Sequence, residues 1–343
     1  MIEATLASLA ERVSLDSQTV QKTVSAVLKG ECSDIEIAAL LTALRVKGET
    51  IDEVVGAVRA LRAHVTPIQH KHDVLLDTCG TGGDGLHTFN ISTATALVVA
   101  ACGVPIAKHG NRGISSSSGS ADVLRELGVN IEADVPTVER CLDQLNLGFC
   151  YAPLLHTAMK HVAPVRRALR FRTLFNLLGP LTNPAGADFQ LLGTSQPEIG
   201  EKLAQSLCQL GCKRAFVICG MDGLDEVSLN DATRVWEVNP GDSDNPIASF
   251  TWTHEDFDLP SRSLQEIEVD SPSASARVIT AVLEGQQNAA RDVILANSAA
   301  ALYLVGKVDS LPSGVQKAAA IIDTGSAQTL LNHLSEMSHV GQN

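Results

Sequence analysis

Apolar positions in the first 67 residues recur every three or four places along the chain. Leu6, Leu9 and Val13 form one such series, and this period is that of an amphipathic helix with one buried face. Two Ser/Thr-x-x-Glu sequences have the form of helix capping boxes, Ser33 with Glu36 and Thr50 with Glu53. Residues 1–67 are therefore predicted to form a small helical domain. Its apolar surface exceeds what it can bury alone, so the surplus is expected to meet another subunit or a later segment.

A different pattern starts at residue 73, where short apolar runs alternate with helical patterns. Strands are expected at residues 74–76, 104–107, 129–131, 148–151, 190–193, 215–219, 233–238 and 249–252. Helices are expected at residues 94–102, 119–127, 136–145 and 197–210, with further helical patterns after residue 271. This alternation is typical of an α/β domain with a mostly parallel sheet.

Residues 153–186 interrupt the alternation. They contain prolines at turn positions, many cationic side chains and apolar residues at helical spacing. We expect them to leave the sheet as helices and to dock on the N-terminal helical domain. The predicted organisation is a helical domain of residues 1–67, joined by helices from about residues 153–186, and an α/β domain of residues 73–152 and 187–343.

The stretch from residue 77 to residue 120 combines glycine, hydroxyl side chains and cations between apolar runs. Three glycines within residues 80–83 follow the first expected strand, where they let backbone N–H groups approach an anion closely. Residues 90–93 open an apolar helix, and the start of a helix favours negative charge. The second strand leads to the cations of residues 108–112. Two such loops at neighbouring strand ends predict a phosphate-binding site.

Each loop taken alone has a plain structural explanation. A glycine-rich loop is often a tight turn, and a run of serines is often a solvated linker. The spacing matches neither GxxxxGK[ST] nor GxGxxG, so it supports neither a P-loop NTPase nor a dinucleotide-binding fold.

Two adjacent carboxylates, Asp225 and Glu226, follow the strand expected at residues 215–219 in a glycine-containing loop. Mg²⁺ takes one or two protein carboxylates together with water and substrate phosphate, so the pair is a candidate metal site. The alternative is an ordinary turn with solvated acids. The two phosphate loops favour the metal.

Composition narrows the class of protein. The chain carries 39 acidic residues against 26 Lys and Arg, a net charge of −13, which argues against a nucleic-acid-binding surface. Its eight cysteines lack CxxC pairs and lie mostly in apolar runs, as reduced thiols do in a reducing compartment. The sequence indicates neither a signal peptide nor an apolar stretch of membrane-spanning length. We therefore expect a cytoplasmic protein with no membrane or nucleic-acid partner.

Five motifs occur in the order GTGGD, NIST, KHGNR, GSADVL and DGLDE, and together they closely resemble the anthranilate phosphoribosyltransferase family over essentially the whole chain. The resemblance implies a nucleoside phosphorylase/phosphoribosyltransferase-like fold. It implies transfer of the phosphoribosyl group from phosphoribosyl pyrophosphate to the amine of anthranilate, with Mg²⁺ as cofactor, in tryptophan biosynthesis. Such a transfer depends on electrostatics and orientation, which fits a chain without a Ser/His/Asp or Cys/His set. We also expect a homodimer formed through the helical domain.

The resemblance assigns roles to individual positions. The donor would be held by Gly80, Gly83, Asp84, Thr88, Asn90, Ile91, Ser92, Thr93, Lys108, His109, Gly110, Asn111, Arg112, Gly113, Ile114, Ser115, Ser116 and Ser120. Mg²⁺ would be held by Ser92, Asp225 and Glu226. Anthranilate would lie against Asn111 and Arg166, with Gly80 nearby. The expected catalytic residues are Lys108 and Arg166. His109 and His156 lie near the site, where a lone histidine is more often structural than catalytic.

The sequence departs from the family pattern at four positions. Ser117 stands where Lys is common, Thr157 where Pro is common, and Ala168 and Arg170 where Glu and Gly are usual. The first change removes a phosphate partner. The last alters the helix beside Arg166, so these positions bear on the preference for the acceptor.

Two other interpretations stay open at this point. Pyrimidine nucleoside phosphorylases resemble this fold and also break a ribosyl bond, but they typically carry Lys-Thr-Ser in place of residues 90–92. A nucleic-acid-binding relative without transfer activity would show degraded phosphate loops and a basic surface. The intact loops and the acidic composition of this chain favour the transferase.

Overall fold

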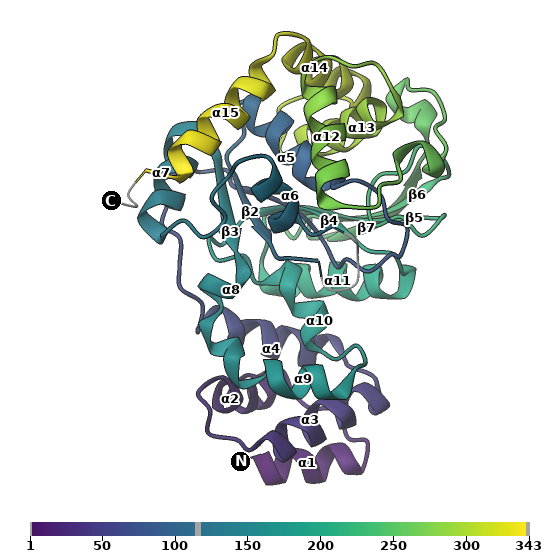
Figure 1. Cartoon of the computed structure of the whole chain (residues 1–343). Coiled ribbons are helices and arrows are strands. Elements are labelled where there is room, and N and C mark those ends of the chain that lie inside the picture. Colours follow the sequence, from purple (N-terminus) through teal and green to yellow (C-terminus); the bar gives the residue numbers. More distant parts are fainter. Residues whose placement is uncertain (1, 114–117, 341–343) are drawn as a thin grey trace.

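The protein has a small helical part and a larger part built around a sheet. The structure is a computed structural model that describes residues 2–113 and 118–340. Figure 1 shows the helices from the start of the chain at one end and the sheet between layers of helices at the other. Within the described residues, none of the helices has both the length and the apolar character that crossing a membrane requires.

The helical part contains the first four helices. They are α1 (Ile2–Ala10), α2 (Ser17–Leu28), α3 (Asp34–Lys47) and α4 (Ile51–Arg62). Both predicted capping boxes are confirmed, at the starts of α3 and α4. Glu53 in the second box is fully buried, and its carboxylate also accepts from Leu15 N at 3.0 Å and Lys47 Nζ at 2.9 Å. This capping residue therefore also ties α4 to the end of α3 and to the segment before α2.

The larger part holds a seven-stranded sheet in the order β3-β2-β1-β4-β5-β6-β7. The strands are β1 (Leu76–Gly80), β2 (Ile106–Gly110), β3 (Leu147–Tyr151), β4 (Phe189–Gly193), β5 (Arg214–Gly220), β6 (Thr233–Val238) and β7 (Ile247–Trp252). Strands β1 to β5 pair in parallel, and β6 and β7 join the edge antiparallel. The predicted fold class, α/β with a mostly parallel sheet and an N-terminal helical domain, is confirmed.

One expected strand, at residues 129–131, is absent. Val129 and Ile131 are 3% and 5% exposed, so the alternation of apolar residues reflects burial. Their neighbour Asn130 bonds to the last helix, because its N–H and its side chain both donate to Ser338. The segment packs into the core without pairing to another strand. Alternating burial alone does not distinguish a paired strand from an unpaired buried segment.

Helices cover both faces of the sheet (Figure 1). They are α5 (Ile91–Ala101), α6 (Ser120–Glu126), α7 (Val135–Leu145), α11 (Pro197–Leu210), α12 (Pro272–Leu283), α13 (Ala289–Leu304), α14 (Leu311–Asp323) and α15 (Ser326–Ser338). On one face, Leu97 of α5 and Ile294 of α13 share a core with Phe216 of the sheet. On the other, α11 packs between the sheet and the helical part, in a core that continues to Leu44 and Val58.

The chain returns to the helical part between β3 and β4. This segment contains α8 (Ala152–Leu155), η1 (Thr157–His161), α9 (Ala163–Leu169), α10 (Phe175–Leu178) and η2 (Gly179–Leu181). It lies against the N-terminal helices (Figure 1), and Val165 and Phe175 are buried in their core. Asn183 then pins the returning chain to the sheet, because its Nδ2 donates to Asp77 Oδ2 and to Ala107 O, both at 2.7 Å.

Candidate active site

The loops singled out from the sequence meet at the carboxyl ends of β1, β2 and β5. Parallel strands end at one edge of a sheet, so loops far apart in sequence are brought together there. The loop after β1 reaches β5 through Gly82, whose N–H donates to Asp225 Oδ2 at 3.1 Å. The start of α5 reaches the same loop, because Ser92 N donates to Glu226 Oε1 at 3.0 Å. Both acids therefore face the segment between β1 and α5, Asp225 at its glycine loop and Glu226 at the start of the helix.

The loop after β1 depends on close approach of backbones. Gly82 and Gly83 have φ values of +63° and +75°, in the left-handed region that favours glycine. At the base of the loop, Thr81 N donates to Gly193 O at 2.9 Å. A Cβ on Gly193 would overlap the carbonyl oxygen of Asp225, so only glycine lets β4 pass this close to the acidic loop.

The carboxylates of Asp225 and Glu226 are held in an environment that disfavours their charge. Burial raises the pKa of Asp225 to about 7, and the neighbouring Asp84 carboxylate adds to this shift. Burial also raises the pKa of Glu226 to about 8, with the charge of Asp225 as the next cause. A cation between these acids would relieve both effects.

The donor set at the acidic loop fits Mg²⁺. Within residues 2–113 and 118–340, no group of three or more His, Cys, Asp or Glu side chains is arranged to hold a metal. Mg²⁺ does not need one, because it binds through one or two carboxylates and keeps water and phosphate oxygens as its other ligands. Asp225 and Glu226 with the nearby Ser92 match that requirement.

Several predicted donor residues at the start of α5 are occupied by the protein itself. Asn90 Oδ1 accepts from Ser118 Oγ at 2.6 Å and from Ser275 Oγ at 2.9 Å, and its Nδ2 donates to Ser118 O. Ile91 and Thr93 are each 1% exposed, so their side chains face the core. Thr88 pairs with Glu268 in an isolated antiparallel bridge. The start of α5 therefore offers a ligand its backbone N–H groups and the side chain of Ser92, and not the side chains of Asn90, Ile91 or Thr93.

Lys108 lies beneath the site. Its side chain is 2% exposed, and its Nζ donates to Thr78 O at 2.6 Å and to Ser92 Oγ at 3.2 Å. Burial lowers the pKa of Lys108, while the charge of the buried Asp77 acts in the opposite direction. The ammonium therefore acts on the site through the Ser92 hydroxyl in this structure.

In its described residues, the loop after β2 is held by polar side chains, among them Asp122 of α6. Asp122 Oδ2 accepts from Gly113 N at 2.9 Å and from Gly119 N at 3.2 Å. Ser120 Oγ donates to Asn111 O, and Asn111 is exposed. Arg112 pairs with Glu132 at 3.5 Å. The predicted donor residues Ile114, Ser115 and Ser116 lie outside the described residues, as does Ser117.

Two histidines form a buried pair beside β2. His156 Nε2 lies 3.1 Å from His109 Nε2, and His109 Nδ1 lies 3.1 Å from Gly179 O. Burial lowers the pKa of His109 to about 3 and that of His156 to about 4, so both rings are neutral at pH 7. The contact between His109 and Gly179 O ties β2 to the start of η2, which follows the segment that carries Arg166.

Arg166 lies on α9 and is half-buried. Its guanidinium carbon is 5.8 Å from the centre of the Phe175 ring, and burial lowers the pKa of Arg166. Arg172, on the same returning segment, donates from Nη2 to the carbonyl oxygens of Gly82 and Gly83. The segment therefore brings the guanidinium of Arg172 to the loop after β1.

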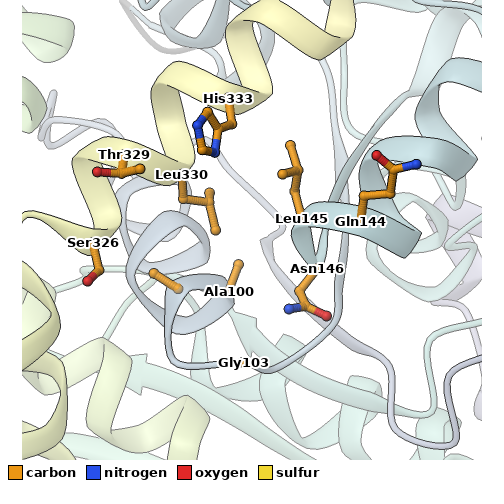
Figure 2. A pocket seen from close by; sticks show the side chains of 10 residues that line it. Ala100, Gly103, Gln144, Leu145, Asn146, Ser326, Thr329, Leu330 and His333 are labelled. Atoms are coloured by element: carbon orange, nitrogen blue, oxygen red, sulfur yellow. The ribbon is translucent and has the colours of Figure 1, made fainter.

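An open hollow lies elsewhere in the molecule. Figure 2 shows it between the ends of α5 and α7 and the face of α15, with His333, Thr329 and Asn146 around it. Its lining residues Gly103 and Asn146 precede β2 and β3, so it lies at the amino ends of these strands. None of the predicted site residues lines it.

Comparison with known proteins places this geometry in a family. Residues 4–65 match the model of the glycosyl transferase family, helical bundle domain, and residues 72–328 match that of the glycosyl transferase family, a/b domain. A curated anthranilate phosphoribosyltransferase from Rhodopirellula baltica is 49% identical over 322 residues, covering 94% of this chain and 93% of the relative. The chain belongs to the anthranilate phosphoribosyltransferase family.

Solved structures from the anthranilate phosphoribosyltransferase family share the fold. The enzyme of Thermus thermophilus gives a TM-score of 0.91 at 38% identity, covering 98% of this chain and 99% of that one. The enzyme of Saccharomyces cerevisiae in complex with phosphoribosyl pyrophosphate and Mg gives a TM-score of 0.88 at 29% identity, covering 98% of both chains. The resemblance inferred from the five motifs is confirmed.

Some residues that build this site of an anthranilate phosphoribosyltransferase were not assigned from the sequence. Asp122 fastens the loop after β2, Ser275 supports Asn90, and Arg172 reaches the loop after β1. Asn297, inside α13, is a further such residue, and its contacts lie directly beside the acidic pair. Its Oδ1 accepts from Val227 N at 2.9 Å, and its Nδ2 donates to Val227 O at 3.2 Å. Only the GSADVL motif gave a signal, for Asp122.

Replacing Asn297 by Ala is expected to lower the free energy of unfolding by about 3 kcal/mol, because buried backbone groups lose their partners. Asn297 is fully buried and also donates to Val293 O at 2.9 Å. Ser298→Ala is the matched control, since the buried Ser298 Oγ has no hydrogen-bond partner among the described residues. Urea unfolding measures both variants. Equal midpoints for the two would contradict this role of Asn297.

Replacing Arg170 by Gly is expected to raise the free energy of unfolding by about 0.5–1 kcal/mol. Arg170 ends α9 at φ +55°, a conformation that glycine adopts without steric cost, and its side chain is exposed. Arg167→Gly, inside α9, is the control and is expected to lower stability by about 1 kcal/mol. Thermal unfolding distinguishes them by opposite shifts, and a lower midpoint for Arg170→Gly would contradict the explanation.

Proposed function

We propose that this protein transfers the phosphoribosyl group of phosphoribosyl pyrophosphate to the amine of anthranilate, giving N-(5-phosphoribosyl)anthranilate and pyrophosphate in tryptophan biosynthesis. The observation that carries the proposal is the meeting of the glycine loop after β1 and the start of α5 with an acidic pair at the sheet edge, in a chain similar over nearly its whole length to anthranilate phosphoribosyltransferases. The Saccharomyces cerevisiae neighbour is described as a complex with phosphoribosyl pyrophosphate and Mg.

The donor is proposed to lie across the two loops. Backbone N–H groups after β1 and at the start of α5 would receive its phosphate oxygens, because both sets surround the acidic pair and neither needs a side chain to bind an anion. The proposed donor residues are Gly80, Gly83, Asp84, Thr88, Asn90, Ile91, Ser92, Thr93, Lys108, His109, Gly110, Asn111, Arg112, Gly113, Ile114, Ser115, Ser116 and Ser120. For Asn90, Ile91 and Thr93 the backbone is the contributing part, since their side chains are engaged or buried.

Mg²⁺ is proposed to be held by Asp225, Glu226 and Ser92. When bound it would neutralise charge on the pyrophosphate group as that group leaves. Asp225 and Glu226 accept from Gly82 N and Ser92 N, so both carboxylates already lie at backbone N–H groups proposed to receive phosphate. Lys108 supports the Ser92 hydroxyl from below.

Anthranilate is proposed to be held by Arg166, with Asn111 and Gly80 nearby. A planar guanidinium matches a planar carboxylate in shape and charge, and its position against Phe175 limits its freedom. Orientation is the main contribution of these residues, because holding the amine against the ribose carbon replaces a bimolecular encounter.

We further propose a cytoplasmic homodimer formed through the helical domain of residues 1–67, which is joined by helices from about residues 153–186. Val13, Ile35 and Val46 in this part of the chain are 54%, 82% and 71% exposed. Sedimentation analysis is expected to give the mass of two chains at micromolar concentration. A mass of one chain at every concentration would contradict the dimer.

The pathway assignment is tested by growth. Expression of this chain is expected to restore growth without tryptophan to a bacterium that lacks its own anthranilate phosphoribosyltransferase. The matched control is the Asp225→Asn, Glu226→Gln variant expressed to the same level. No growth with soluble wild-type protein would contradict the proposed function.

A further inference from the structure

Arg172 joins the returning segment to the loop after β1, about ninety residues earlier in the chain. Its Nη2 donates to Gly82 O at 3.3 Å and to Gly83 O at 3.0 Å. The backbone behind it is fixed, because Thr173 and Leu174 are 3% and 0% exposed. Thr173 N also donates to Asn176 Oδ1 at 3.0 Å. A rigid part of the segment thus supports a half-buried guanidinium that faces two consecutive carbonyls.

These two bonds set the direction of two N–H groups. In a trans peptide the C=O and the N–H point to opposite sides of the chain. The carbonyls of Gly82 and Gly83 face Arg172, so the N–H groups of Gly83 and Asp84 point away from it. Neither N–H donates to another described residue, whereas Gly82 N is bound to Asp225. Arg172 therefore orients two donors that the fold leaves free for a ligand.

The loop needs such a support. Both glycines have positive φ, and glycine passes between backbone regions at little cost, so the two peptide planes could turn. Among the described residues only Arg172 donates to these two carbonyls. A turned plane would present a carbonyl to an anionic ligand in place of an N–H.

We propose that Arg172 is a positioning residue of the donor site, which holds the Gly82 and Gly83 carbonyls so that the N–H groups of Gly83 and Asp84 face the pyrophosphate group of the donor. This inference rests on the proposed function. It also links the site to the helical part, because the segment that carries Arg172 also carries Arg166 and packs on the N-terminal helices.

The test measures binding and turnover separately. Isothermal calorimetry with Mg²⁺ and inorganic pyrophosphate gives the dissociation constant for the wild type and for Arg172→Met, Arg172→Lys and Arg167→Met. Steady-state kinetics give the KM for each substrate. Arg167→Met is the matched control, since Arg167 is an exposed cation on the same segment without a bond to the loop.

We expect Arg172→Met to weaken pyrophosphate binding about tenfold and to leave the KM for anthranilate within about twofold. Arg172→Lys, which keeps the charge and so remains informative if the Met variant fails to fold, is expected to bind roughly threefold more weakly than wild type. Arg167→Met is expected to bind as wild type does.

Two results would overturn the proposal. They are unchanged pyrophosphate binding in Arg172→Met and wild-type binding in Arg172→Lys. Wild-type protein that binds Mg²⁺ and pyrophosphate yet converts no anthranilate would contradict the proposed function and leave the binding test of Arg172 valid.

Discussion

The double variant Asp225→Asn, Glu226→Gln is expected to lose turnover by a factor on the order of 1,000, with its fold intact. Asn and Gln keep a carbonyl oxygen that can accept from Gly82 N and Ser92 N, so the hydrogen bonds of the loop can persist. They lack the negative charge that holds Mg²⁺. Initial rates at saturating Mg²⁺ and both substrates measure the loss, and circular dichroism measures the fold.

The control for this pair is Asp222→Asn. Asp222 lies in the same loop, but its Oδ2 accepts from Ser228 Oγ at 2.7 Å, away from the pair. Its turnover is expected to stay within about fivefold of wild type. In the double variant, calorimetry is expected to show that Mg²⁺ no longer strengthens binding of pyrophosphate. Wild-type turnover in the double variant would contradict the metal assignment.

Replacing Arg166 by Met is expected to raise the KM for anthranilate about 100-fold, because a charge-assisted pair with the carboxylate is lost. Met keeps most of the apolar stem that packs toward Phe175, so the effect reports the guanidinium. The KM for phosphoribosyl pyrophosphate is expected to stay within about twofold. Steady-state kinetics with each substrate varied in turn separate the two.

Arg167→Met is the neighbour control for Arg166, with an expected KM for anthranilate equal to that of wild type. An aniline without the carboxylate provides a second check, since it should be used equally poorly by wild type and Arg166→Met. An unchanged KM for anthranilate in Arg166→Met would place the acceptor carboxylate elsewhere.

Local signals in the sequence predicted much of the fold. The capping boxes of α3 and α4, the bounds of α11 and the bounds of β6 agree with the structure, because each depends on neighbouring residues. The prediction of a strand at residues 129–131 was wrong, because a segment can bury every second side chain without pairing to another strand. For β1 the apolar run located the strand, but its bounds lie later, at the polar residues that lead into the loop.

Local signals in the sequence likewise predicted some features of the candidate site and not others. The loops after β1, β2 and β5 could be found because glycine and charged residues follow apolar strands. The direction of a side chain could not be predicted, and the structure is needed to show that Lys108 Nζ donates to Ser92 Oγ and Thr78 O. The sequence pattern also could not predict contacts between distant segments, such as the hydrogen bond from Arg172 to Gly83 O and that from Val227 N to Asn297.

The central claim is most directly tested by mixing the purified protein with phosphoribosyl pyrophosphate, anthranilate and Mg²⁺ and quantifying products by mass spectrometry. The account predicts one phosphoribosyl anthranilate and one pyrophosphate for each anthranilate consumed, with no product when Mg²⁺ is removed by a chelator. Pyrophosphate release without phosphoribosyl anthranilate, or no consumption of either substrate by folded protein, would contradict it.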